Sequence, residues 1–293
     1  MNENLLKYYE EESARFLDFL QIPYPYIVPP KEWLTETDPN KILAFFDPHE
    51  PYAIEELFKE ALKHKDAGMV VIGGDLGDFY SKSRYRKTHS VDFSHEVREI
   101  FYRMEWLSTH FKKVKIMKGN HDDRPEKKIA DLFTDGEIDL KILTENNLLG
   151  RLASYFDNIE MVGTKVKNHT YDINLSHIWQ FNDIIFTHAE ISRKQDSTIM
   201  EYLSNYLHTW RYKLQLKPYR VIMQGHNHRM MKGAKGDELW MLCPTAMQDV
   251  SIGGEYIYSP RCQGAPPQRG YAVIYQNDGV TDWNKTNIEL YIQ

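Results

Sequence analysis

Five short apolar runs stand out along the chain, and each of them ends in a cluster of polar side chains. Runs of this kind, rich in β-branched and aromatic residues, are typical of strands that are buried on both faces. They span residues 42–46, 69–72, 114–117, 184–186 and 221–223. Because ligands bind beyond the carboxyl ends of strands in open α/β sheets, five strands side by side would bring the five clusters into one crevice.

Longer segments between the apolar runs have the periodicity of amphipathic helices. The predicted helices cover residues 53–64, 95–111, 139–156 and 197–214. After residue 230 the pattern changes to short strands at 239–242, 271–275 and 288–292, and we expect this tail to complete a second sheet. The pattern alone supports an α/β fold.

The N-terminal segment has a different pattern from the rest. Residues 1–20 place apolar side chains at imperfect helical spacing among acidic ones, which predicts an amphipathic helix that ends before a proline-rich stretch. We expect residues 1–39 to form an extension that packs on the outside of the core, in preference to binding a partner. Residues 40–293 would form one catalytic domain, because the polar clusters run from residue 47 to residue 228 and a boundary between them would divide the site.

Composition narrows the class of protein. The 293 residues are 42% hydrophobic and 27% charged, as in ordinary globular proteins. No apolar run reaches about 18 residues and no cationic start precedes an apolar segment, so we expect a cytoplasmic protein without a membrane partner. Cys243 and Cys262 are expected to be buried free thiols. The net charge of -6 neither supports nor excludes a nucleic-acid substrate, and the sequence does not determine the oligomeric state.

The polar clusters supply imidazole, carboxylate and amide groups. They are Asp47-Pro48-His49, Gly74-Asp75-Leu76-Gly77-Asp78, Gly119-Asn120-His121-Asp122, an isolated His188, and Gly225-His226-Asn227-His228. Borderline divalent ions in hydrolytic centres use such ligands, and a carboxylate can bridge two ions that lie about 3.5–4 Å apart. Each cluster alone could be a structural turn or a helix cap. Their joint order behind strands favours a two-metal site.

The order Asp-x-His, Gly-Asp-x-x-Asp, Gly-Asn-His-Asp, His, Gly-His-x-His resembles that of the calcineurin-like metallophosphoesterase superfamily, over residues 41–275. The resemblance implies an α/β fold that is a four-layer α-β-β-α sandwich with two central mixed β-sheets. It also implies hydrolysis of a phosphate ester by attack of a metal-bound hydroxide, with two divalent metal ions as cofactors. Manganese is the first choice for these ions, and iron, zinc and nickel suit the same ligands.

The resemblance also assigns a role to each cluster residue. It implies one metal held by Asp47, His49 and His228, a second held by Asn120, His188 and His226, and a bridge at Asp75. His121 stays off the metals, is held by Asp122, and protonates the leaving-group oxygen. Asp78 orients ligands from behind the metals or only shapes a turn. The seven other histidines, His177 among them, are expected to be ordinary surface or core residues.

Candidate substrate contacts follow the second and third clusters. Lys82, Arg84 and Arg86 alternate with tyrosines and could clamp phosphate oxygens or stack a base, although a solvated charged loop is the competing interpretation. Arg124 comes soon after the third cluster. Residues 124–182 are long for a plain connection, so we expect a specificity insert there.

The basic residues 82–87 favour a phosphodiesterase, of which a nuclease is one form. A phosphomonoesterase and a protein phosphatase are alternatives, because the same metal site suits them. A non-catalytic scaffold of the same fold is a further alternative. Scaffolds lose metal ligands, whereas every expected position is filled in this chain. We therefore expect an enzyme with a phosphate-ester substrate.

Overall fold

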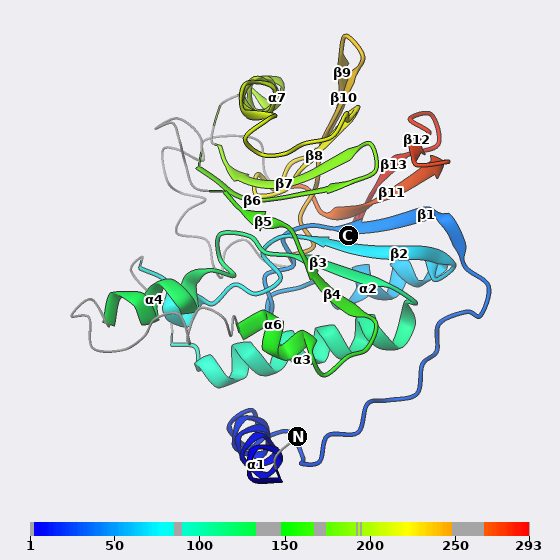
Figure 1. Cartoon of the computed structure of the whole chain (residues 1–293). Coiled ribbons are helices and arrows are strands. Elements are labelled where there is room, and N and C mark those ends of the chain that lie inside the picture. The colour runs from blue at the N-terminus through cyan, green and yellow to red at the C-terminus, as the bar shows by residue number, and fades with distance from the viewer. Residues whose placement is uncertain are drawn as a thin grey trace.

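Two mixed β-sheets face each other in the computed structural model, and helices cover their outer surfaces (Figure 1). The structure describes residues 3–84, 90–132, 148–166, 174–191, 193, 195–247 and 267–292. The layers follow one another as helices, sheet, sheet and helix. This arrangement confirms the predicted α-β-β-α sandwich.

The first sheet has a parallel half and an antiparallel half. Within the described residues its seven strands run in the order β12 (Val280–Thr281), β11 (Gly270–Asn277), β1 (Asp38–Phe45), β2 (Ala67–Gly73), β3 (Val114–Met117) and β4 (Ile159–Val162), with β13 (Asn287–Leu290) also paired to β11. The pairs from β1 to β4 are parallel, whereas β11 lies antiparallel to β1. Three predicted strands therefore lie side by side in this sheet.

The second sheet carries the other two predicted strands. In the part of the chain that is described, its six strands run in the order β5 (Thr164–Lys165), β6 (Asn174–Phe181), β7 (Ile184–Glu190), β8 (Val221–Gln224), β10 (Glu238–Leu242) and β9 (Met231–Lys235). Strands β7 and β8 are parallel, and β6 and β7 form an antiparallel hairpin. The carboxyl ends of β7 and β8 lie close to those of β1 to β3.

Helices pack on the outer face of each sheet. The α-helices are α1 (Glu3–Phe19), α2 (Glu55–Ala61), α3 (Phe93–His110), α4 (Arg124–Leu132), α6 (Leu148–Ala153) and α7 (Asp196–Trp210), and short 3₁₀ turns span Leu62–His64 and Tyr80–Lys82. Helices α2, α3 and α6 cover the first sheet, and α7 covers the second (Figure 1). Among the residues described, no helix combines the length and apolar character that a membrane crossing requires.

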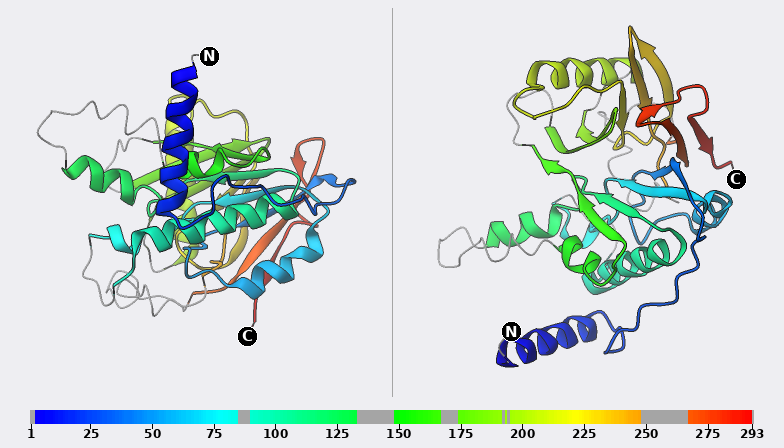
Figure 2. Two further views of the ribbon diagram at one scale, coloured as in Figure 1. Left: turned by 90° about the horizontal axis from the view of Figure 1, so that it is seen from below. Right: turned by 45° about the vertical axis from the view of Figure 1, so that its right-hand side comes forward.

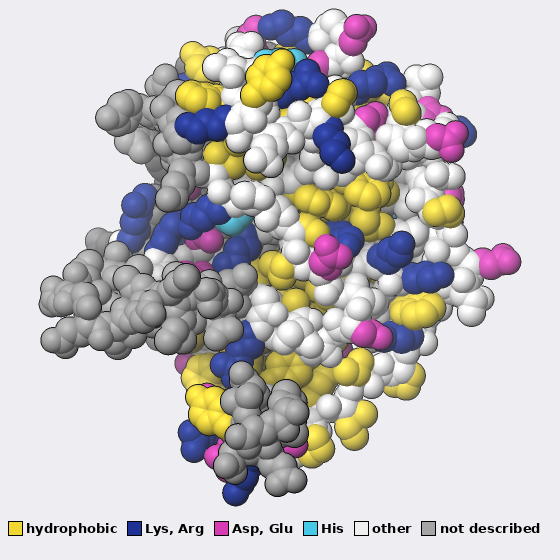
Figure 3. Space-filling model, viewed as in Figure 1, with side chains coloured by type: hydrophobic (Ala, Val, Ile, Leu, Met, Phe, Trp, Pro, Cys, Tyr) yellow, Lys and Arg dark blue, Asp and Glu magenta, His cyan; other side chains and the backbone are white. Residues whose placement is uncertain are grey.

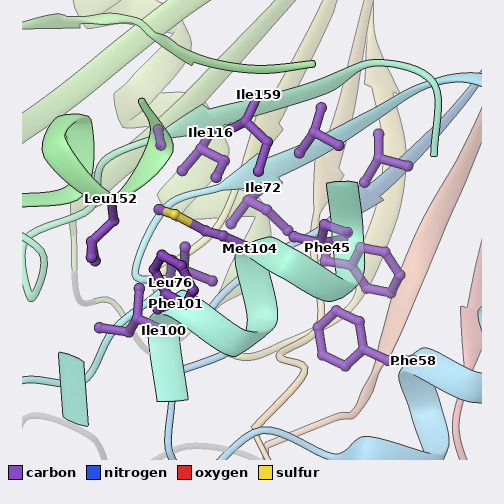
Figure 4. Close-up of a cluster of buried hydrophobic side chains, with 14 of the residues drawn as sticks. Phe45, Phe58, Ile72, Leu76, Ile100, Phe101, Met104, Ile116, Leu152 and Ile159 are labelled. Carbon is purple, nitrogen blue, oxygen red and sulfur yellow. The ribbon is translucent and has the colours of Figure 1, made fainter. Parts of the chain in front are cut away.

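The apolar runs of β1, β2 and β3 in the first sheet are buried on both faces, which explains their unbroken apolar sequence. In β1, Phe45 packs toward the helices, and the adjoining Phe46 packs between the two sheets. Figure 4 shows the helix side, where Phe45, Ile72 and Met104 belong to one buried cluster. Apolar layers on both sides thus fix the strands that carry the first three polar clusters.

The N-terminal helix contacts the core by its C-terminal end. Leu17 and Leu20 are fully buried in the helix-side core, and Arg98 of α3 donates to the side-chain oxygen of Gln21 at 2.8 Å. The rest of α1 extends away from the sandwich in the right view of Figure 2. The structure therefore places this segment on the outside of the core.

Two expectations about the sheets are wrong. The five strands do not form one row, because β1, β2 and β3 belong to the first sheet and β7 and β8 to the second. The tail after residue 230 also divides: β9 and β10 join the second sheet, while β11 and β13 extend the first. The physical reason is that an apolar pattern marks a strand without specifying its neighbours, which depend on contacts distant in sequence.

Candidate metal centre

The polar clusters converge where the carboxyl ends of strands from both sheets meet. The first sheet contributes the residues that follow β1, β2 and β3, and the second contributes His188 on β7 and the two histidines after β8. Among the described residues, the structure contains three groups of potential ligands, and within each group the ligand atoms lie within 4.8 Å of one another. They are Asp47 with His49 and His228, Asp75 with His188 and His226, and His49 with Asp75 and His121.

The first group matches the predicted ligands of one metal. Nε2 of His49 lies 3.3 Å from Nε2 of His228. Oδ1 of Asp47 lies 3.8 Å from Nε2 of His49 and 3.5 Å from Nε2 of His228. Ligand bonds of about 2.0–2.2 Å place two ligands of one ion roughly 3–3.6 Å apart. The spacing therefore suits a single divalent ion.

Asp75 connects the first group to the second. Its Oδ2 atom lies 3.3 Å from Nε2 of His188 and 3.8 Å from Nε2 of His49. One carboxylate oxygen is thus close to an imidazole from each group, as a bridging ligand requires. His226 completes the second group with His188.

Buried oxygen atoms and carboxylates provide an independent sign of cations. Oδ2 of Asp75 and Oδ1 of Asn120 are buried without a hydrogen bond to any residue that the structure describes. Asp47, Asp75, Asp78 and Asp122 are each at most 1% exposed. Buried polar oxygens normally have partners, and buried charges require compensation. These residues therefore fit divalent cations.

The same carboxylates act on the histidine between them. Burial opposes protonation of His188, but the negative charges of Asp75 and Asp47 outweigh it and raise the pKa of this imidazole to about 9. A site that attracts a proton this strongly also attracts a divalent cation, because both respond to the same negative potential.

The backbone at these clusters is strained. Five of the seven predicted ligands have a left-handed conformation: Asp47 (φ 50°), His49 (φ 54°), Asp75 (φ 50°), His226 (φ 69°) and His228 (φ 54°). For residues with a side chain this conformation costs roughly 1–3 kcal/mol each and is concentrated at functional sites. His226 and His228 thus follow β8 in a turn, and they do not alternate along a strand.

Two glycines of the clusters are needed for close approach. A Cβ atom on Gly119 would lie 2.1 Å from Oδ1 of Asp75, and one on Gly74 would lie 2.4 Å from the ring of His188. Any larger residue would push a proposed ligand away. The Gly-Asp and Gly-Asn pairs therefore belong to the geometry of the site.

His121 is engaged through both ring nitrogens. Nδ1 lies 2.8 Å from Oδ1 of Asp78, and Nε2 lies 2.8 Å from Nη2 of Arg124. Burial and the positive charge of Arg124 hold the pKa of His121 well below its usual range, so Nε2 accepts from the guanidinium. Although His121 is near Asp75, this arrangement favours its predicted place off the metals.

The predicted partner of His121 is corrected by the structure. Asp78 accepts the hydrogen bond from Nδ1, whereas the Asp122 carboxylate accepts from the backbone N–H groups of Gly77 at 3.0 Å and Gly119 at 2.8 Å. The turn that follows Asn120 directs the side chain of Asp122 toward the loop after β2. Asp78 also lies 3.1 Å from Nδ1 of His49, which is the position that an orienting partner behind a predicted ligand would have.

The candidate substrate contacts have different surroundings. Arg124 donates from Nη1 to the Asp78 carbonyl oxygen at 2.7 Å and reaches the site through His121. The Lys82 amine lies 4.2 Å from the centroid of the Phe93 ring, on α3, and Arg84 is exposed. Arg86 lies outside the described residues. Parts of the proposed insert at 124–182 form β4, β5 and β6, which belong to the two sheets.

Two buried residues next to the site were not identified from the sequence. Asp123 directly follows the third cluster, and its Oδ2 atom lies 3.4 Å from Nε2 of His177. His177 pairs with His188 across the β6–β7 hairpin. The two-residue turn at Asn182 and Asp183 is a signal that could have revealed this register.

Several solved structures are similar to this chain at low sequence identity. No curated protein matches the chain. Among solved structures, a zinc complex of Vps29 from Entamoeba histolytica is 14% identical, with 86% of this chain and 98% of that chain covered and a TM-score of 0.39. An archaeal phosphodiesterase is 10% identical, with 86% and 99% covered and a TM-score of 0.35. The hypothetical protein PH1004 from Pyrococcus horikoshii is 9% identical, with 86% of each chain covered and a TM-score of 0.43.

The sequence model of one family, described as calcineurin-like phosphoesterase, matches residues 40–230. This range is more than half of the chain and contains all five polar clusters. The order of the clusters, the two facing sheets and the ligand groups at their meeting edge agree with that match. The chain belongs to the calcineurin-like phosphoesterase family.

Proposed function

We propose that this protein is a dinuclear metal-dependent phosphodiesterase. The observation that carries the proposal is the convergence of two ligand groups that share Asp75, with a buried imidazole, His121, directly beside them. A manganese pair and a cytoplasmic location are the finer features that we propose with it. Nucleic acid is one proposed substrate class.

The proposed ligand sets follow from the contacts. Asp47, His49 and His228 would hold one cation, Asn120, His188 and His226 the other, and Asp75 both. When bound, two divalent cations supply Lewis acids that neutralise phosphate charge and lower the pKa of a bound water to about 7.

His121 has the position of a proton donor. Asp78 holds its Nδ1 atom, and Nε2, which accepts from Arg124, lies 4.0 Å from Oδ2 of Asp75 at the proposed bridge. When a phosphate oxygen takes over the N–H of Arg124, Nε2 can carry a proton. The Asp78 carboxylate would then stabilise the imidazolium, which would pass this proton from Nε2 to the leaving-group oxygen. Such general acid catalysis contributes about 10²–10⁴-fold in rate.

Arg124 has the position of a phosphate clamp. Its guanidinium is fixed by the Asp78 carbonyl oxygen at 2.7 Å and lies beside Nε2 of His121. A guanidinium presents two parallel N–H groups to two phosphate oxygens, which orients the ester as well as binding it. The preference for a diester rests on the basic segment at residues 82–87, in which Arg84 is exposed.

The substrate class can be tested with one panel of esters. Metal-reconstituted protein and the His121→Ala variant are assayed on bis-nitrophenyl phosphate, nitrophenyl phosphate, and single- and double-stranded DNA and RNA. We expect the diester to be hydrolysed faster than the monoester, and both activities to fall in the variant. Faster monoester hydrolysis would contradict the diester preference. A nuclease should also lose affinity log-linearly with salt, whereas a small-molecule diesterase should not.

A further inference from the structure

The two halves of the metal centre come from different sheets, so their relative position must be fixed. Asn120 follows β3 in the first sheet, whereas His188 lies on β7 in the second. Functional constellations need placement within about 0.5 Å. The contacts between the sheets are largely apolar, as with Phe46 and Phe186, and apolar packing has no preferred direction. A directional contact across the gap is therefore needed.

Asp123 makes such a contact. It is 3% exposed, three residues after Asn120, and its Oδ2 atom accepts from the Lys165 amine at 2.7 Å and from Nε2 of His177 at 3.4 Å. On its own sheet the Lys118 amine lies 3.7 Å from Oδ1. One buried carboxylate thus joins the loop after β3 to strands β5 and β6 of the opposite sheet.

The residues that Asp123 contacts are in register with a proposed metal ligand. Lys165 on β5 is directly opposite His177 on β6, which is directly opposite His188 on β7. Residues opposite one another on neighbouring strands share a face of the sheet. The three side chains therefore form one row that runs from the metal centre to the edge of the sheet. Figure 3 shows that Lys and Arg side chains gather on the left part of the described surface.

We infer that Asp123 is a positioning residue that holds His188 and Asn120 at the separation which the second metal requires. The inference rests on the proposed function, because it assumes that a cation binds these two ligands. Among the described residues, the Asp123 side chain contacts His177, Lys165 and Lys118 and none of the proposed ligands. It acts through His177 and Lys165 on one side and through the turn after Asn120 on the other.

The first metal position has cross-sheet contacts of its own. The Thr245 hydroxyl, after β10 of the second sheet, donates to the Asp47 carbonyl oxygen at 2.7 Å. The backbone N–H of Thr245 donates to the Gln268 carbonyl oxygen at 3.0 Å, and the N–H of Gln268 donates to the His228 carbonyl oxygen at 2.8 Å. These bonds place His228 against Asp47 without Asp123. Loss of Asp123 should therefore weaken the second metal selectively.

The test compares metal binding to wild type, Asp123→Asn and a matched control. Asp157→Asn is the control, because Asp157 also pairs with a lysine, Lys31 at 2.9 Å, but its side chain is 82% exposed and lies away from the site. Metal-free proteins are titrated with Mn²⁺ by calorimetry, and electron paramagnetic resonance follows the spin-coupled pair. We expect Asp123→Asn to bind the second equivalent at least about tenfold more weakly, with the first unchanged and the coupled signal reduced.

Asp157→Asn should bind both equivalents as wild type does. Equal affinities in Asp123→Asn and wild type, or equal weakening of both equivalents, would overturn the inference. Lys165→Met provides a second variant if Asp123→Asn does not fold, and it should weaken the second equivalent in the same selective way. Wild type that binds fewer than two equivalents would instead contradict the proposed function itself.

Discussion

Arg124 donates a hydrogen bond from Nη2 to Nε2 of His121, with 2.8 Å between the two nitrogens. The other ring nitrogen of His121 lies 2.8 Å from Asp78. The atom proposed to deliver a proton therefore lies next to the group proposed to bind phosphate. Arg124 and His121, which contact each other, would therefore orient the substrate and transfer the proton together.

Replacement of Arg124 by Met should lower kcat/KM by about 10–100-fold, because hydrogen bonds to charged groups contribute roughly 1.5–3 kcal/mol each. Arg124→Lys should restore only part of the loss, since an ammonium group cannot make the bidentate contact. Steady-state kinetics on bis-nitrophenyl phosphate measure the effect. Arg98→Met, on the outer helix α3, is the matched control and should keep the wild-type kinetics. An unchanged kcat/KM in Arg124→Met would contradict the clamp.

Asp78→Asn should weaken the first metal and slow turnover together. Oδ1 of Asp78 lies 3.1 Å from Nδ1 of His49 and 2.8 Å from Nδ1 of His121, and an amide cannot accept from both with a full charge. Loss of such an orienting partner reduces metal affinity by about 10–100-fold. Calorimetry with Mn²⁺ measures it. Asp122→Asn should mainly lower thermal stability, because that carboxylate binds backbone groups. Slower turnover in Asp122→Asn, with only a stability loss in Asp78→Asn, would instead support Asp122 as the residue that holds His121.

Arg103 should be important for stability, because it compensates a buried charge beside the first cluster. Its Nε atom donates to Glu50 at 2.5 Å, and both side chains are less than 10% exposed. Arg103→Met leaves Glu50 uncompensated and should reduce the free energy of unfolding by about 3–5 kcal/mol. Urea unfolding measures it, and Glu50→Gln in the same chain should recover part of the loss.

The control for Arg103 is Lys59→Met. Lys59 pairs with Glu55 at 3.8 Å on the surface of α2, so its removal should change stability by about 1 kcal/mol or less. A similar small change for Arg103→Met would show that Glu50 is not held by this ion pair.

Glu96 should make stability fall as pH rises. This side chain is buried on α3 and accepts hydrogen bonds from Ser81, and burial raises its pKa to about 7 from an ordinary value near 4.5. Between these values the folded state binds the proton more tightly than the unfolded state does. The stabilisation is therefore complete below about pH 4.5 and is lost, by up to roughly 3 kcal/mol, as pH rises through 7.

Glu96→Gln removes the titrating group and should flatten this dependence. Urea unfolding between about pH 5 and pH 8 compares the two proteins. A variant that keeps the wild-type slope would show that another group is responsible.

The strands and most of the site could be predicted from the sequence because their signals are local. Asp47, Asp75 and Asn120 each follow an apolar run, so their place at a strand end follows from chain order. The partner of His121 could not be predicted in this way. Asp122 is adjacent in sequence, but Asp78 is the residue that the loop after β2 brings to the ring.

Other features depend on pairing between distant segments. The tail strand β11 joins β1 in the first sheet, and no periodicity in residues 270–277 indicates that partner. His177 gave no signal by itself. Its importance depends on its register with His188 and on the approach of Asp123 from the opposite sheet.

The central claim is that two divalent cations bind to one site and that hydrolysis depends on both. Metal-free protein titrated with Mn²⁺, with bound metal and bis-nitrophenyl phosphate hydrolysis measured on the same samples, tests this most directly. We predict two bound ions per chain, with activity that appears as the second ion binds. Full activity with a single bound ion, or two tightly bound ions without hydrolysis of any phosphate ester, would contradict the account.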